Sequence, residues 1–106
     1  MTRQLRITPR VFEEDRRLVF LMLLAGQPDY SSAHYALNQA LDVLGHSVSI
    51  DKLKVDAAWL EEQGLITITR PAPNLEVYKL TSRGKDVAEN KTTVPGVKQP
   101  EPGLDY

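Results

Sequence analysis

The sequence predicts an α+β domain in which three helices are followed by a two-stranded β-hairpin and a short final helix. Three observations support this fold class. A helical apolar pattern ends at Gly64 and runs directly into a β-prone stretch. Two β-prone runs then follow each other with a short proline-containing loop between them. Two earlier helical patterns, each ended by glycine, precede this segment.

The first two helices have clear start and stop signals. The first is expected over residues 9–25, because Pro9 loses no hydrogen bond at the first helical position. Ser31 or Ser32 is expected to cap the second helix, and Gly45 is expected to close it. These signals predict a pair of consecutive helices before the third.

The third helix and the hairpin carry the most specific pattern. The helix is expected to start at Ser47 or Ser49 and to end at Gly64. Its apolar side chains recur at helical spacing and would form the core stripe: Ile50, Leu53, Ala57 and Leu60. Strands are expected over residues 65–70 and 75–80, joined by a loop that two prolines stiffen.

The last helix and the tail complete the expected organisation. Thr81 is expected to cap a helix that ends near Asn90, so residues 1–90 would form one winged domain with a basic N-terminal arm. The composition changes at Lys91. Residues 91–106 are rich in proline and glycine and contain little to bury, so this tail is expected to be disordered.

This order of elements resembles the winged helix-turn-helix of transcription regulators. The resemblance rests on WLEEQGLI at residues 59–66 and YKLTSRG at residues 78–84. The whole chain, with VPGVK at residues 94–98, is similar to small winged-helix proteins of Mu-like phages and prophages that are often labelled arsenic-repressor-type regulators. The resemblance implies a DNA-binding regulator. Arsenic repressors sense metals through cysteines, which this chain lacks, so metal sensing does not follow.

Composition restricts the class of protein. With 13 basic and 14 acidic residues the net charge is −1, so the whole-protein field does not attract phosphate backbones. The absence of cysteine excludes disulfides and thiolate metal sites. The longest apolar run, residues 18–25, is shorter than the roughly 20 residues that span a bilayer. We therefore expect a cytoplasmic protein of a bacterial host cell that does not bind membranes.

The sequence contains no pattern typical of catalysis. His34 and His46 lie in different segments, and neither has a carboxylate at a metal-binding spacing. Glycine-rich phosphate loops and nucleophile elbows are absent. We therefore expect no enzyme activity, no metal, no cofactor and no small-molecule ligand.

The third helix offers few basic side chains to DNA. Lys52 and Lys54 could contact bases or phosphates, whereas Asp51, Asp56 and Glu62 would repel phosphates. An arm and a wing could supply the remaining charge, with weak sequence preference. The hypothesis of duplex DNA binding assigns contacts to Arg3, Arg6, Arg10, Ser49, Lys52, Lys54, Arg70, Lys79, Arg83 and Lys85. The alternative for any single one of them is a solvated surface charge.

The first helix suggests a homodimer. Residues 18–25 are apolar on every face, and a small domain can rarely surround such a helix completely. The expected partner or dimer surface comprises Leu18, Phe20, Met22, Leu24, Val55 and Trp59. The alternatives are that the domain covers the helix unaided and that Trp59 folds back onto the first helix or the sheet.

Two functions stay open. The first is a transcription regulator that binds duplex DNA as a dimer through the arm, the third helix and the wing. The second is a non-enzymatic adaptor that holds another phage protein through the face around Val55 and Trp59. The acidic third helix favours the adaptor, whereas the fold and the basic arm favour DNA.

Overall fold

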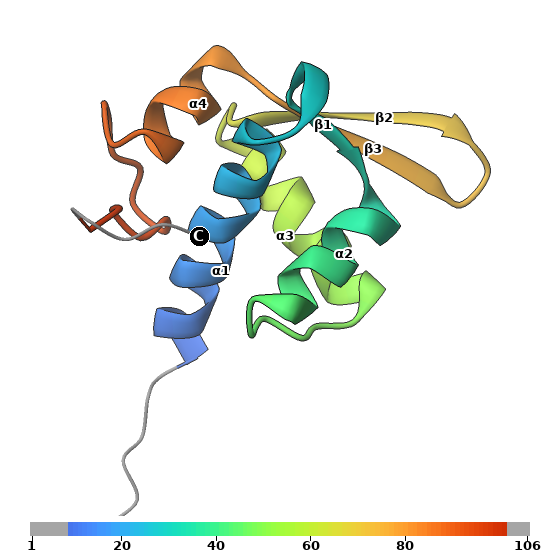
Figure 1. Cartoon of the computed structure of the whole chain (residues 1–106), viewed down its shortest axis with the longest axis horizontal. Helices are drawn as coiled ribbons and strands as arrows, with labels where there is room; N and C mark the ends of the chain where they lie inside the picture. Colours follow the sequence, from blue (N-terminus) through green and yellow to red (C-terminus); the bar gives the residue numbers. More distant parts are fainter. Residues whose placement is uncertain (1–8, 102–106) are drawn as a thin grey trace, which may run out of the picture.

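The computed structural model describes residues 9–101 and shows four α-helices and a three-stranded sheet in that part of the chain (Figure 1). The elements are α1 (Pro9–Ala25), the short 3₁₀ helix η1 (Pro28–Tyr30), β1 (Ser31–Ala33), α2 (His34–Val43), α3 (Ile50–Glu62), β2 (Ile66–Ala72), β3 (Leu75–Leu80) and α4 (Ser82–Ala88). The predicted α+β class and order are confirmed, with η1 and β1 as additions.

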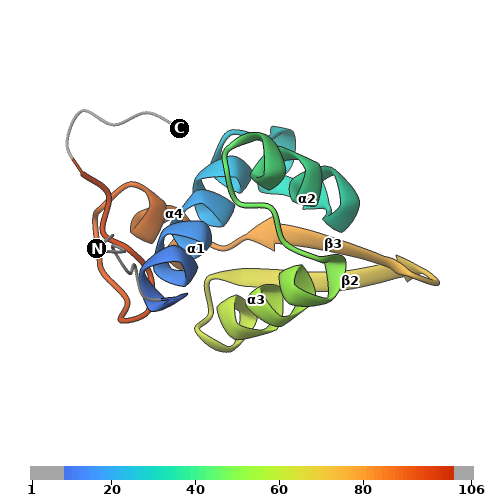
Figure 2. The same cartoon turned by 90° about the horizontal axis from the view of Figure 1, so that it is seen from below.

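The sheet has the order β1-β3-β2, and both pairings are antiparallel. Lys79 of β3 lies opposite Ser31 on one side and Thr67 on the other. The helices α1, α2 and α3 gather on one face of the sheet, and the β2–β3 hairpin projects beyond them (Figures 1 and 2). The sequence analysis missed β1, because three residues at a helix start give no strand pattern of their own.

The predicted end of α2 and the predicted caps of α3 and α4 are confirmed by their hydrogen bonds and backbone angles. The predicted cap of α2 is wrong, because Ser31 and Ser32 belong to β1 and α2 follows Ala33 with no side-chain cap. The Ser49 hydroxyl accepts a hydrogen bond from the Lys52 amide over 3.1 Å and caps α3. The Thr81 hydroxyl caps α4 in the same way. Gly45 and Gly64 have φ values of 90° and 76°, a conformation that glycine adopts without a Cβ clash. These residues set where α2, α3 and α4 begin or end.

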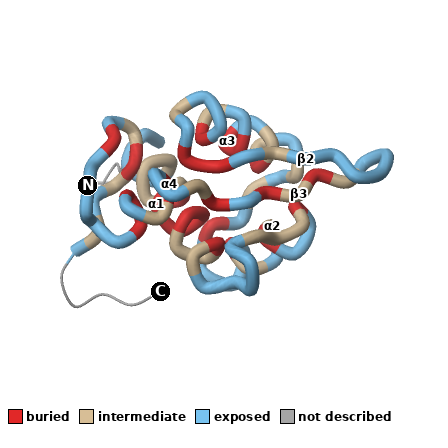
Figure 3. The backbone as a smooth tube through the Cα atoms, turned by 90° about the horizontal axis from the view of Figure 1, so that it is seen from above, coloured by how far each residue is buried: buried red, intermediate tan, exposed pale blue. Residues whose placement is uncertain are grey.

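The core surrounds the second half of α1, whereas Val11 and Phe12 in its first turns are exposed. Leu18, Phe20 and Leu24 are fully buried within their own chain, and Met22 is partly buried against the same core. The buried segments, red in Figure 3, lie in the body, whereas the hairpin tip is exposed. Three residues of the expected dimer surface are therefore not available to a partner. The sheet, α2 and α4 contact α1 and supply the cover that the sequence analysis assigned to a second subunit.

The structure differs from the expectation of a disordered tail. Residues 91–101 run back along α1, where Val94 and Val97 are only 4% and 9% exposed. Arg17 Nη1 donates to the Gly96 carbonyl over 3.0 Å, and the Lys98 amide donates to the Glu14 carbonyl over 3.1 Å. Two valines suffice to anchor a segment that is otherwise polar. Residues 102–106 lie outside the described part of the chain.

Candidate nucleic-acid interface

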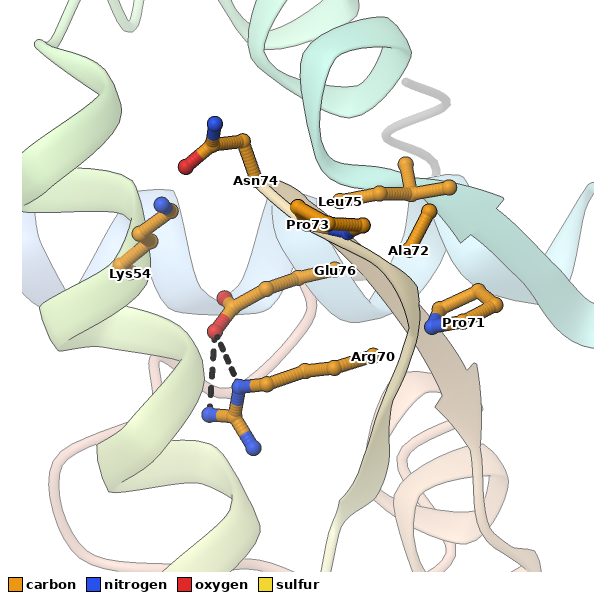
Figure 4. A pocket seen from close by; sticks show the side chains of 8 residues that line it. All are labelled: Lys54, Arg70, Pro71, Ala72, Pro73, Asn74, Leu75 and Glu76. Atoms are coloured by element: carbon orange, nitrogen blue, oxygen red, sulfur yellow. Dashed lines mark hydrogen bonds and ion pairs between the residues drawn. The ribbon is translucent and has the colours of Figure 1, made fainter.

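An open hollow of about 490 Å³ lies between α3 and the hairpin (Figure 4). It is lined by Lys54 of α3 and by Arg70, Pro71, Ala72, Pro73, Asn74, Leu75 and Glu76 of the hairpin. Lys54 and Arg70 are thus brought together from two elements, as the DNA hypothesis requires. The Arg70 side chain is 65% exposed, so its guanidinium can reach a ligand in solution.

Glu76 holds Arg70 at this hollow. Arg70 Nε donates to Glu76 Oε2 over 3.0 Å, and the Tyr78 hydroxyl donates to Glu76 Oε1 over 2.7 Å. Burial raises the pKa of Glu76, but the Tyr78 hydrogen bond and the Arg70 charge outweigh burial, so the pKa lies below its ordinary value. Glu76 therefore stays ionised and fixes one edge of the guanidinium.

Tyr78 and His34 both form hydrogen bonds with Glu76. Burial, followed by the hydrogen bond to Glu76, raises the pKa of Tyr78 far above its ordinary value, so its hydroxyl remains a donor. The Glu76 amide donates to His34 Nδ1 over 3.1 Å and joins β3 to the start of α2. Sequence reasoning missed this set. The sequence could have predicted the contact between Glu76 and Tyr78, because residues 76 and 78 of one strand share a face.

The other predicted basic residues lie in separate groups. Lys79 Nζ is 3.4 Å from Asp29 Oδ1, and Lys85 Nζ lies 5.3 Å from the centre of the Tyr30 ring, so both surround η1. Arg83 Nε donates to the Gln63 carbonyl at the end of α3. These three basic side chains do not line the hollow.

A further group lies where α1 meets α3. Lys52 Nζ is 3.3 Å from Glu13 Oε1, and this contact is the main reason that the pKa of Glu13 lies below its ordinary value. Arg10 faces Glu14 at 3.6 Å, and Ser49 serves as the helix cap. Arg3 and Arg6 lie outside the described residues.

The expected patch of Val55 and Trp59 does not form. Val55 is 59% exposed, but Trp59 is covered by the tail at Gly96 and by the Arg17 guanidinium, whose Cζ lies 4.1 Å from the ring centre. The alternative interpretation, in which Trp59 folds back onto the first helix, is confirmed. The exposed line on α3 is instead formed by Asp51, Val55, Ala58 and Glu62.

Within residues 9–101 no three histidine or acidic side chains gather at a possible metal site. In the same part of the chain, every helix is too short or too polar to cross a bilayer. The charged side chains at the hollow are the two cations Lys54 and Arg70 and the carboxylate of Glu76.

The chain is similar in sequence to two proteins of known source. No protein-family model matches the chain. The uncharacterized protein gp26 of Escherichia phage Mu is 41% identical over 92 residues, which cover 87% of this chain and 94% of gp26. An uncharacterized protein of Haemophilus influenzae is 39% identical over 70 residues, covering 66% of this chain and 68% of that protein. The expected resemblance to proteins of Mu-like phages is confirmed.

Solved structures of RosR from H. salinarum share the fold. One RosR structure superposes with a TM-score of 0.62 at 18% identity, covering 72% of this chain and 67% of RosR. The hsRosR-S1 complex structure gives a TM-score of 0.60 at 18% identity, covering 71% of this chain and 65% of that chain. This likeness shows that the predicted winged-helix fold is correct. By its sequence, the chain belongs to the family of gp26 of phage Mu.

Proposed function

We propose that this phage-type protein is a transcription regulator that binds duplex DNA through α3, the hairpin and the N-terminal arm. The observation that carries the proposal is the convergence of Lys54 and Arg70 on one hollow between α3 and the hairpin. A helix and a hairpin that together present two cations fit the phosphates that border a groove of the duplex.

The ion pair with Glu76 orients the Arg70 guanidinium for such a contact. Glu76 holds its Nε and Nη2 groups at 3.0 Å, and this leaves Nη1 for a phosphate oxygen. Asp51 and Glu62 on α3 repel phosphates, so few base contacts are expected from this helix. Binding would depend on the backbone, with Arg3 and Arg6 adding charge from the arm.

The salt dependence of DNA affinity tests this proposal. Labelled random duplexes and duplexes from the native genomic neighbourhood are titrated at several salt concentrations. Each phosphate contact contributes about 0.9 to the slope of log K against log salt, so Lys54→Glu with Arg70→Glu should lower the slope by about two. Lys79→Glu with Lys85→Glu is the matched control, because it changes the net charge equally at η1, away from the hollow, and should leave the slope unchanged.

A dimer remains part of the proposal, with a surface that differs from the expected one. Val11 and Phe12 in the first turns of α1 are 53% and 50% exposed and could meet their counterparts across a two-fold axis. Light scattering would then give twice the monomer mass of 11.9 kDa, and Phe12→Asp would return the monomer. A wild-type mass of one chain at all accessible concentrations would contradict the dimer.

The adaptor is the second candidate, because Val55 is exposed between two acids on the helix that should read DNA. If no duplex binds in a salt-sensitive manner at tens of micromolar protein, the DNA proposal fails and the adaptor is favoured.

A further inference from the structure

One face of α3 lacks any cover in the described structure. Asp51, Val55, Ala58 and Glu62 follow one another at spacings of four, three and four residues, which places them in a line opposite the core, and all four are exposed. We call this line the α3 stripe. On one side of the α3 stripe, the tail covers Trp59. On the other side, Glu61 Oε2 accepts a hydrogen bond from the Ile68 amide of the hairpin.

The two acids of the α3 stripe have no ion-pair partner among residues 9–101. The nearby Lys52 forms an ion pair with Glu13 instead, with 3.3 Å between Nζ and Oε1. Asp51 and Glu62 therefore flank an apolar centre with uncompensated negative charge. A segment with two basic residues around an apolar one would complement this surface in charge and in character.

The chain itself contains such a segment. Residues 1–8, MTRQLRIT, place Leu5 between Arg3 and Arg6 and join α1 at Pro9. Pro9 lies one turn before Glu13, which contacts Lys52 beside Asp51. An extended segment of this length spans about 26 Å, whereas the α3 stripe from Asp51 to Glu62 is about 16 Å long. The segment is therefore long enough to follow the stripe from its near end to its far end.

We propose that the N-terminal arm, residues 1–8, docks along the α3 stripe in the free protein. The arm supplies two positive charges, Arg3 and Arg6, for the acids of the α3 stripe and one apolar side chain, Leu5, for its centre. Because the acids of the α3 stripe are exposed, added salt weakens the contact. The docked arm also keeps its arginines from DNA phosphates, so the contact must open when the arm binds a duplex. The docking itself requires no DNA, and its test does not depend on the DNA proposal.

A spin label on the arm tests the docking in the full-length chain. The protein has no cysteine, so Thr2→Cys provides a single labelling site. In ¹⁵N spectra without DNA, the label should broaden the amide signals of Val55 and Ala58 more than those of Tyr35 and Ala36, which are exposed at the start of α2. Salt at about 0.5 M should remove most of this difference, because it screens charges beyond a few ångströms.

Charge variants sharpen the result. Asp51→Asn with Glu62→Gln should abolish the broadening, whereas the matched pair Asp42→Asn with Asp86→Asn, exposed acids outside α3, should preserve it. Arg3→Glu with Arg6→Glu should abolish it as well, and adding Asp51→Arg and Glu62→Arg should restore it. Equal broadening on α3 and α2, or broadening centred on another surface, would overturn the proposal. So would broadening that appears only between labelled and unlabelled copies, because the occupant would then be the arm of a second chain.

Discussion

An arginine–carboxylate pair in the body of the molecule and another in the hairpin differ in their access to water. In the body, Arg16 of α1 pairs with Asp56 of α3, with side-chain exposures of 7% and 1%. In the hairpin, Arg70 pairs with Glu76, with exposures of 65% and 12%. The first pair fixes two helices against each other. The second leaves a guanidinium at the surface, where it can exchange its contacts for those of a ligand.

This difference indicates how the fold divides stability from binding. The body buries the second half of α1 and holds the tail against this helix, so substitutions there should act on the free energy of unfolding. The hairpin projects into solvent and carries its charge on an open hollow, so substitutions there should act on ligand affinity with smaller effects on folding.

Removal of Asp56 should give the largest loss of stability. Asp56→Ala leaves the buried Arg16 charge unpaired, which costs about 3–5 kcal/mol of unfolding free energy. Urea denaturation measures it. The double variant Arg16→Met with Asp56→Leu removes both charges and should lose much less. Equal losses in the two variants would show that packing, and not the unpaired charge, accounts for the effect.

Gly84 tests the close approach of α4 to the body. A Cβ at this position would lie 2.1 Å from the Leu65 carbonyl oxygen and 2.7 Å from Leu80 Cδ1. Gly84→Ala should therefore destabilise the protein by about 2–3 kcal/mol in denaturant titrations. Gly26→Ala is the matched control, because its nearest contact is an ordinary 3.7 Å. A neutral Gly84→Ala would mean that α4 can shift away at little cost.

Gly96 tests whether the tail belongs to the body. A Cβ there would lie 2.6 Å from Trp59 Cζ2, and the residue has a φ of 98°. Gly96→Ala should detach the tail, lower stability by about 1–2 kcal/mol and shift the emission of the single tryptophan to longer wavelength. Gly45→Ala shares the positive φ but meets no atom within 4 Å, so it should leave the emission unchanged. Identical emission in both variants would contradict the packing of the tail.

Tyr78 tests the hairpin network and should give the smallest effect. Tyr78→Phe removes one buried hydrogen bond, which is worth about 1 kcal/mol. The pKa of Glu76 is depressed in the folded protein, so its contribution to stability is present above its ordinary value of 4.5 and is lost as the pH falls through the folded-state pKa. Without the tyrosine donor this pKa rises, and acid unfolding should begin at higher pH. Unchanged acid unfolding would show that the hydrogen bond from Tyr78 does not control the pKa of Glu76.

Local sequence signals determined where most elements begin and end. The hydroxyls of Ser49 and Thr81 accept hydrogen bonds from amides three residues later, and Gly64 permits the positive φ that ends α3. These effects act within a few residues, so the sequence displays them directly. β2 alone among the predicted strands extends beyond its expected end, to Ala72, because an edge strand tolerates Pro71.

Tertiary structure alone decided which surfaces remain free. The apolar pattern of α1 shows that the helix must be buried, but not whether its own domain or a second subunit buries it. Likewise, the composition of residues 91–101 does not reveal that Val94 and Val97 find places in the core. Both outcomes depend on contacts between residues far apart in the chain, which local propensity does not encode.

The candidate site shows the same division. By itself, the sequence determined a winged-helix domain, most of its helix ends, the exposed Val55 and an acidic third helix. Only the tertiary structure showed that Lys54 and Arg70 line one hollow and that Glu76 binds Arg70 there. The physical reason is that a hydrophobic period identifies the buried face of each element, whereas the meeting of charges depends on how the elements pack in three dimensions.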